Sequence, residues 1–251
     1  MTRNADLVIE FWKAGMAAPE APAPRVERVL DSAAELLVRW GYQRVTIDEV
    51  ARHAGIGKGT VYLHFRSKDA LFVTVLLRVQ RGIVERLADR MAAQPREVLP
   101  SRVMRGLYAE LAADPVTRPL YLGDPEVLGR LAHEAADTVG ELAAQRTGAV
   151  TEHLRLLAEA GCLRPGLDVD EALYTFSAVS IGFLSIDGYG TGLQPALDPG
   201  VRAGLLERAL AAALEAPDPP AAALDRLAPE IAQRYRSLLV HIDHEWRRRV
   251  R

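Results

Sequence analysis

The spacing of apolar residues is the feature that most restricts how this chain can fold. Between residues 26 and 40 the apolar side chains recur every three or four residues, which is the period of an α-helix and not of a strand. Similar helical segments cover about 67–92, 96–113, 124–161, 168–187, 200–215 and 224–248, and stretches such as QPALDPG separate them. No segment alternates convincingly with the period of two that a half-buried strand requires. The sequence therefore predicts an all-α fold.

Signals for helix ends divide the start of this fold into separate helices. The first helix carries an apolar face from Val26 to Trp40, and Gly41 is placed to end it in a left-handed turn. Thr46 and Glu49 then form a T-x-x-E capping box, in which each residue satisfies a free backbone N–H of the other. This box predicts a short second helix that ends near residue 55.

A glycine turn and two further helices follow. After Gly55-Ile56-Gly57 the chain can form a short helix over 58–65 with Val61 and Phe65 facing inward, and Ser67 can cap a long fourth helix. Two short helices across a glycine turn, braced by longer ones, make a helix-turn-helix. We therefore expect a helix-turn-helix domain over 25–70 and a second, wholly helical domain over 71–251, joined by the long fourth helix.

Composition excludes several classes of protein. The chain has 251 residues, is 49% hydrophobic and carries a formal net charge of −2, so it can bury a real core but has no global attraction for nucleic acid. Its single cysteine, Cys162, rules out an internal disulfide framework. Because it contains neither a membrane-spanning run nor a signal peptide, we expect a cytoplasmic protein. Residues 1–24 alternate alanine with proline before the first helix and are predicted to form a flexible leader.

The glycine-rich stretch GIGKGT, residues 55–60, looks like a loop that holds a phosphate. A nucleotide-binding Walker loop follows a strand and places serine or threonine directly after its lysine, but here Lys58 is followed by Gly59. The glycine spacing also departs from the dinucleotide-binding fingerprint. A DNA backbone fits better, because small residues at the start of a short helix let the helix approach a groove closely. The helical period turns Lys58, Gly59, Tyr62 and, less fully, His64 outward.

The run from Val26 to Leu76, with TIDEVARHAGIGKGTVYLHFRSKDALF at its centre, resembles the DNA-binding domain of the TetR family of bacterial transcriptional regulators. The specific part is G-x-G-K-G-T-x-Y-x-H-F followed by x-S-K-x-x-L; the rest is similar to the family only in layout. The resemblance implies a repressor that binds a palindromic operator in double-stranded DNA as a homodimer and is released by a small effector. It implies phosphate or base contacts for Thr46, Lys58, Gly59, Thr60, Tyr62, His64 and Lys68.

The C-terminal domain is expected to supply both the dimer interface and the effector pocket. The helix over 168–187 is apolar nearly all round, and together with the helix over 224–248 it is our candidate for a four-helix dimer interface; an internal core helix of a monomer is the alternative. An apolar or aromatic effector would lie among residues that combine apolar bulk with a few hydroxyls, each of which could also be plain core. These residues are Met104, Tyr108, Leu111, Leu128, Leu157, Phe176, Ser180 and Phe183.

An enzyme is the rival class. His133, Glu134, Asp137, Glu141 and His153 invite a metal or acid–base interpretation, but H-E-x-x-D lacks the second histidine of H-E-x-x-H, so we interpret these residues as a solvated helix face. His53 is likewise expected to be solvated. We therefore expect no enzymatic activity, no metal and no cofactor. A regulator that has lost effector sensing remains a third possibility.

Overall fold

The computed structural model describes residues 24–114, 117, 136–186, 195 and 197–250. The predicted leader before residue 24, Leu128, His133 and Glu134 lie outside these ranges. The described residues are helical throughout apart from turns and one isolated bridge between Leu163 and Glu215, so the all-α prediction is confirmed for them. None of their helices is long and apolar enough to cross a membrane.

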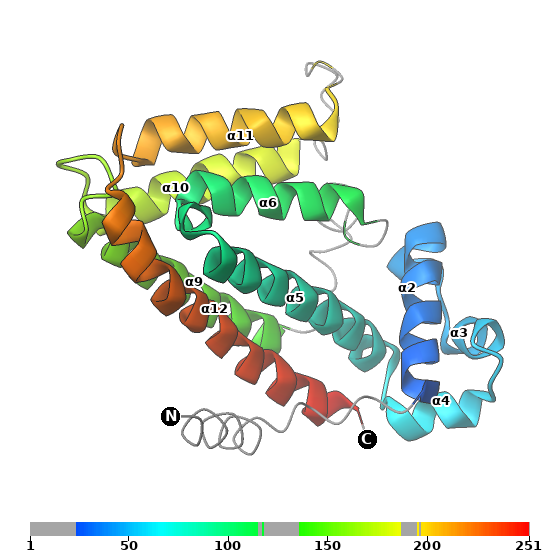
Figure 1. The fold of residues 1–251 in the computed structure, drawn as a ribbon. Helices are drawn as coiled ribbons and strands as arrows, with labels where there is room; N and C mark the ends of the chain where they lie inside the picture. Colours follow the sequence, from blue (N-terminus) through cyan, green and yellow to red (C-terminus); the bar gives the residue numbers. More distant parts are fainter. Residues whose placement is uncertain (1–23, 115–116, 118–135, 187–194, 196, 251) are drawn as a thin grey trace, which may run out of the picture.

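A small N-terminal lobe, which we call the head, contains three helices: α2 (Pro24–Arg44), α3 (Ile47–His53) and α4 (Lys58–His64). Figure 1 shows α3 and α4 to the right of and below the upright α2. The Thr46 hydroxyl accepts from the Glu49 amide, and the Glu49 carboxylate accepts from the Thr46 amide, which confirms the predicted capping box. Gly55, with a φ of 67°, then turns the chain into α4.

The end of the first helix differs from the prediction in one side chain. Gly41 breaks the helix as expected, with a φ of 73°. Trp40, however, is 45% exposed and does not join the apolar face, so that prediction was wrong. Past the break, Tyr42 is buried instead, and its ring packs edge-on against Phe72 with 5.4 Å between the ring centroids. Because the helix is kinked at Gly41, the core of the head contains Tyr42 and not Trp40.

The long helix α5 (Lys68–Ala93) connects the head with the larger lobe, which we call the body. The Ser67 side chain caps it by accepting from the Ala70 amide at 3.0 Å, as predicted. Its first two turns still belong to the core of the head through Leu71 and Phe72, whereas residues from Ile83 onward pack in the core of the body. The boundary predicted at residue 70 thus lies at the start of a helix that both lobes share.

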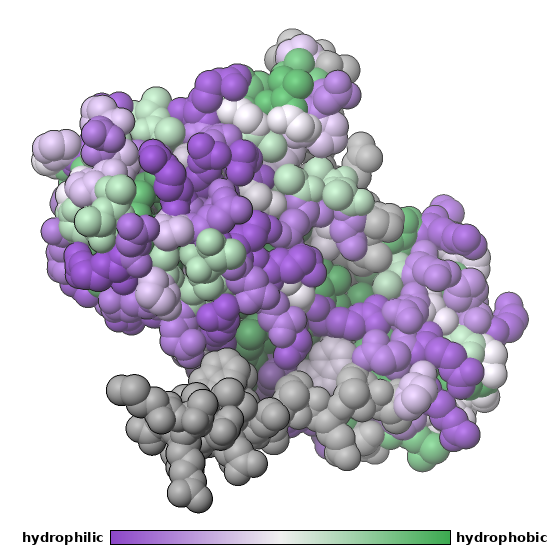
Figure 2. Space-filling model, in the orientation of Figure 1, coloured by the Kyte–Doolittle hydropathy of each residue, from purple (hydrophilic) through white to green (hydrophobic). Residues whose placement is uncertain are grey.

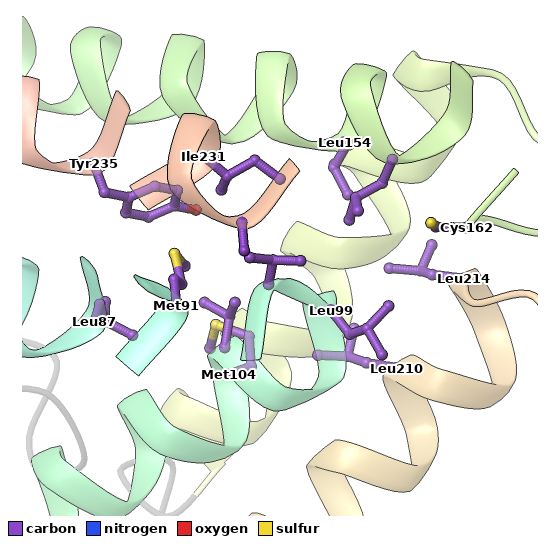
Figure 3. Packing of buried hydrophobic residues seen from close by; sticks show 14 of the residues in the cluster. Leu87, Met91, Leu99, Met104, Leu154, Cys162, Leu210, Leu214, Ile231 and Tyr235 are labelled. Carbon is purple, nitrogen blue, oxygen red and sulfur yellow. The ribbon is translucent and has the colours of Figure 1, made fainter. Parts of the chain in front are cut away.

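Beyond α5 the body contains a 3₁₀ turn, η1 (Pro95–Val98), and the helices α6 (Pro100–Ala113), α9 (Ala136–Glu159), α10 (Val169–Ser185) and α11 (Pro199–Leu214). The single helix predicted over 96–113 is therefore interrupted at Leu99, where the backbone is extended before Pro100. Figure 3 shows Met91, Leu99, Met104 and Leu210 meeting in the core between these elements.

The last helix, α12 (Ala221–Arg249), runs back along α5 toward the head (Figure 1). This helix packs on α5, α9 and η1, while α10 packs chiefly on α11 and α9. A four-helix interface needs two adjacent helices from each protomer, and α10 and α12 do not form such a pair. The helix over 168–187 and the helix over 224–248 are therefore not packed as such a pair in this protomer, because α12 lies on α5, α9 and η1. The dimer interface stays a prediction.

The prediction that His153 belongs to a solvated helix face was also wrong. Its side chain is 3% exposed, and its ring lies between α9, η1 and α12. Nε2 is 2.7 Å from the carbonyl oxygen of Val98, and Nδ1 is 3.1 Å from the hydroxyl of Tyr235. Burial lowers the pKa of His153 to about 4. The residue is thus a neutral, hydrogen-bonded part of the core, and no group of three potential metal ligands occurs among the described residues.

Candidate nucleic-acid interface

Two buried side chains fix the orientation of α4. Val61 and Phe65 are both fully buried in the core of the head, as predicted. They anchor one face of this seven-residue helix, so the opposite face must point to solvent. That face begins directly after the glycine turn, where the first amides of the helix have no intrahelical partners and favour an anion.

The outward face of α4 presents Lys58, Gly59, Tyr62 and Leu63. The Tyr62 and Leu63 side chains are 43% and 68% exposed. Leu63 is the residue that the sequence analysis missed, although its spacing of four from Gly59 already puts it on this face. In Figure 2 a hydrophobic spot lies at the lower edge of the head, over α4. An exposed leucine beside a lysine and a tyrosine can contact a thymine methyl group or a sugar, as major-groove helices do.

Gly59 has no conformational reason to be a glycine in the free protein. It lies within α4, and a Cβ added to it would meet no protein atom within 4 Å. Gly55, by contrast, needs its positive φ for the turn. Glycine in a helix costs up to about 1 kcal/mol relative to alanine. The free protein therefore gains nothing from the missing side chain at Gly59, but an external surface that approaches α4 closely would.

Lys58 is paired within the head. Its Nζ lies 2.8 Å from a carboxylate oxygen of Asp48 in α3, and both side chains are about half exposed (51% and 54%). The hydrogen bond and the charge of Asp48 raise the pKa of Lys58, so its ammonium group stays charged. Because such an exposed pair is weak, the lysine can exchange this carboxylate for a phosphate or a guanine.

Thr46 and Lys68 are similarly occupied by neighbours. The Thr46 hydroxyl donates to the Glu49 carboxylate at 2.8 Å, so its proton is not free for a phosphate while the capping box holds. The Lys68 ammonium lies 4.2 Å from the centre of the Tyr42 ring, which is a cation–π contact. Thr60 and His64 are half-buried at the two edges of the outward face. Five of the seven predicted residues thus belong to α4 and two to neighbouring segments, and they are not equally exposed.

His53, expected to be only solvated, carries a specific contact. Its Nε2 lies 2.8 Å from a carboxylate oxygen of Glu35 in α2. This pair ties the end of α3 to α2 on the exposed side of the head. Because both side chains are exposed, the contribution of this pair to stability is small.

The predicted effector residues divide into two groups. Met104, Tyr108, Leu111 and Leu157 are almost fully buried in the core of the body. Phe176 and Phe183 on α10 are half-buried against it. Ser180, also on α10, is 5% exposed, and its hydroxyl has no hydrogen-bond partner among the described residues.

A cavity of about 230 Å³ lies elsewhere, between the head and the body. Its walls come from α2, α5 and α6 and include Arg78, Arg86 and Glu110. These side chains are paired, since Arg78 binds Glu27 at 2.9 Å and Arg86 binds Glu110 at 2.9 Å. None of the seven predicted effector residues that the structure describes lines this cavity. An effector pocket formed by those residues therefore stays a prediction.

The helices α10 and α11 present apolar side chains to solvent. Tyr174 and Ile181 on α10 are 78% and 63% exposed, and Val201 on α11 is 48% exposed. Figure 2 shows a hydrophobic patch at the upper edge of the molecule, over the start of α11. This pair of helices has an apolar surface that nothing within the described protomer covers.

Comparisons with known proteins agree with this geometry. Residues 29–75 match the sequence model of bacterial regulatory proteins of the tetR family. The HTH-type transcriptional regulator AlkX of Mycobacterium tuberculosis is 30% identical over 149 residues, covering 53% of this chain and 67% of AlkX. The HTH-type transcriptional activator FasR of Mycolicibacterium smegmatis is 31% identical over 164 residues, covering 60% of this chain and 73% of FasR. Some relatives match less completely; YerO of Bacillus subtilis matches over only 28% of its length.

The fold has solved counterparts. The SmeT–triclosan complex superimposes with a TM-score of 0.60 at 23% identity, covering 78% of this chain and 93% of SmeT. FadR of Bacillus subtilis in complex with stearoyl-CoA superimposes with a TM-score of 0.57 at 17% identity, covering 73% of this chain and 96% of FadR. At these identities the likeness concerns the fold alone. With the head, the family match and the relatives taken together, the chain belongs to the TetR family, whose members are DNA-binding regulators of transcription that act as dimers.

Proposed function

We propose that this protein is a ligand-responsive repressor that acts in the cytoplasm, binds a palindromic operator as a homodimer and is released by a small effector. The observation that carries the proposal is the outward face of α4. There, Gly59 leaves space that the protein itself does not use, between a charged lysine and the exposed side chains of Tyr62 and Leu63. This combination suits a helix that enters the major groove.

The homodimer rests on the apolar surface of α10 and α11. Two copies that cover Tyr174, Ile181 and Val201 against each other would form a four-helix bundle with two-fold symmetry. A two-fold dimer carries two α4 helices, and these can read adjacent major grooves only if they lie about 34 Å apart along the DNA. The operator is then a palindrome. This pairing replaces the one that the sequence suggested, because α12 is already covered by α5.

Repression is the simpler regulatory outcome for such a dimer. A dimer seated on an operator blocks polymerase without any further surface, whereas activation needs a surface that contacts polymerase. The relatives include both kinds: the HTH-type transcriptional repressor Rv1474c of Mycobacterium tuberculosis is 27% identical over 74% of its length, and FasR is named an activator. A reporter placed behind the operator distinguishes them, since deletion of the protein should raise expression from a repressed promoter and lower it from an activated one.

The effector is proposed to be an apolar or aromatic molecule with a few polar groups. Around α10 the core is formed by apolar side chains, including the half-buried Phe176 and Phe183, and Ser180 contributes a buried hydroxyl without a partner. A ligand that offers one polar group to this hydroxyl would satisfy it. To lower operator affinity tenfold, the ligand must bind the DNA-free arrangement better by about 1.4 kcal/mol.

The test of the proposal is DNA binding in solution. A palindrome selected from a random-sequence pool, or DNA that flanks the protein's own gene, is titrated while fluorescence anisotropy and mass are recorded. Two protomers per duplex, and an affinity that falls steeply with salt, would support the proposal. Binding of one protomer, or equal affinity for selected and random duplexes, would contradict it.

A further inference from the structure

The helix α12 extends from the far end of the body to the head. It runs antiparallel to α5, and ion pairs fix the two helices along their length: Arg236 binds Asp89 at 2.9 Å, and Asp243 binds Arg81 at 3.0 Å. Toward its end, Ile242 packs in one cluster with residues from the first half of α5. As a result the C-terminal end of α12 lies beside the N-terminal part of α5, on the same side as the head.

The last turns of α12 are held on the head by packing and charge. Trp246 and Val250 pack against the core of the head. Directly before Trp246, the buried Glu245, whose side chain is 4% exposed, accepts from Arg248 at 2.9 Å and from Arg249 at 2.6 Å. The carboxylate is thus satisfied twice, and the helix end has a defined position next to the DNA-binding helices.

This helix end carries more positive charge than its own packing requires. Arg249 is largely buried by its pairing with Glu245, but Arg247 is exposed and Arg248 keeps 63% of its side chain exposed. Arg247 forms no ion pair with a described residue. In Figure 1 the red end of α12 and the helix α4 both reach the lower edge of the molecule. Two exposed guanidinium groups therefore lie at the edge that presents α4, in a chain whose net charge is −2.

We propose that Arg247 and Arg248, at the end of α12, bind the phosphate backbone beside the half-site that α4 reads. The inference rests on the proposed function, since it places a second contact element on the same DNA. Arginine suits this role because its guanidinium group donates to phosphate oxygens, and such contacts fix the position of a protein on DNA without reading its sequence. Because α12 belongs to the body, the body itself then touches the DNA that the head recognises.

The test uses the full-length chain and a matched control. The double variant Arg247→Gln/Arg248→Gln removes two charges at the end of α12, and Arg164→Gln/Arg226→Gln removes two charges from exposed positions of the body outside the proposed dimer interface. Affinity for the selected palindrome and for a random duplex of equal length is measured by anisotropy between 50 and 200 mM salt. Each lost phosphate contact should make the slope of log affinity against log salt shallower by about 0.9. If both arginines contact phosphates, the ratio of the wild-type affinity to that of Arg247→Gln/Arg248→Gln should therefore fall roughly tenfold between 50 and 200 mM salt.

Further measurements separate the possible outcomes. Loss of affinity on both duplexes with a shallower slope, restored by Arg247→Lys/Arg248→Lys and absent from the control, would support the inference. An unchanged slope in the first variant, while wild type binds the palindrome with its usual salt dependence, would overturn it and leave the proposed function intact. If wild type binds no duplex, the proposed function fails first. A melting temperature equal to that of wild type shows that the variant still folds.

Discussion

Acid should destabilise this protein through one buried histidine. In the neutral ring of His153, Nε2–H donates to the Val98 carbonyl and Nδ1 accepts from the Tyr235 hydroxyl, so both nitrogens are satisfied. A second ring proton would bring a positive charge into a core that excludes water. This desolvation is the reason why the pKa of His153 lies near 4 rather than at its ordinary value of 6.5.

The size of the effect follows from that difference. The unfolded chain takes up a proton at His153 as the pH falls below 6.5, but the folded chain does so only near pH 4. Between these values the unfolded state binds more protons, so the free energy of unfolding decreases as the pH falls. The difference between a pKa of 6.5 and one of about 4 corresponds to about 3 kcal/mol of unfolding free energy. None of this free energy is lost above pH 6.5, and nearly all of it is lost at pH 4.

Urea unfolding at several pH values measures this loss. Other groups also titrate, so the quantity of interest is the difference between wild type and His153→Gln, which should amount to about 3 kcal/mol between pH 7 and pH 4. The variant His244→Gln is the control, because His244 is exposed near the end of α12. If wild type and His153→Gln lose the same free energy of unfolding over this range, His153 is not kept neutral by burial in the folded protein.

Five other substitutions test the proposed roles of residues in the head, in α10 and at the end of α12. Asp48→Asn should raise affinity for operator and random DNA alike by about threefold, because it releases Lys58 and removes a like charge beside the phosphates; a lower affinity in anisotropy would contradict this. Lys58→Ala should weaken discrimination between sequences, whereas Tyr62→Phe should weaken binding to all sequences equally, and equal losses for both variants would refute this division. Ser180→Ala should stabilise the free protein by about 1 kcal/mol in urea unfolding, since the hydroxyl has no partner, and should reduce the response to the effector. Trp246→Ala should cost about 2 kcal/mol of unfolding free energy, and a neutral effect would show that the end of α12 is not held on the head.

The parts of the fold that could be predicted from the sequence depend on local physics. The capping box at Thr46, the cap at Ser67 and the break at Gly41 involve residues within four positions of one another, so their hydrogen bonds and backbone angles can be inferred from the sequence pattern. The inward face of α4 follows from the helical period in the same way. Trp40 was wrongly predicted to join the apolar face because the helical period stops at Gly41. Past that kink the core of the head contains Tyr42.

The parts that could not be predicted depend on distant partners. The interaction of His153 with Tyr235 joins residues 82 positions apart, and the pair of Arg81 with Asp243 joins residues 162 positions apart. A histidine among charged residues has the same sequence pattern whether it is solvated or buried, and only the packing of α12 decides between the two. The same holds for the dimer interface, since α12 is as amphipathic as a dimerisation helix and differs only in being covered by α5.

The central claim, that the outward face of α4 approaches DNA closely, is tested most directly at Gly59. An added Cβ meets no protein atom, so Gly59→Ala should fold normally and gain up to about 1 kcal/mol in unfolding free energy. If DNA occupies that space, the same variant should lose about tenfold or more in operator affinity, which is about 1.4 kcal/mol. Gly148→Ala, at an exposed position of α9 with equal room for a Cβ, should gain stability and keep its affinity. An operator affinity of Gly59→Ala equal to that of wild type would contradict the account.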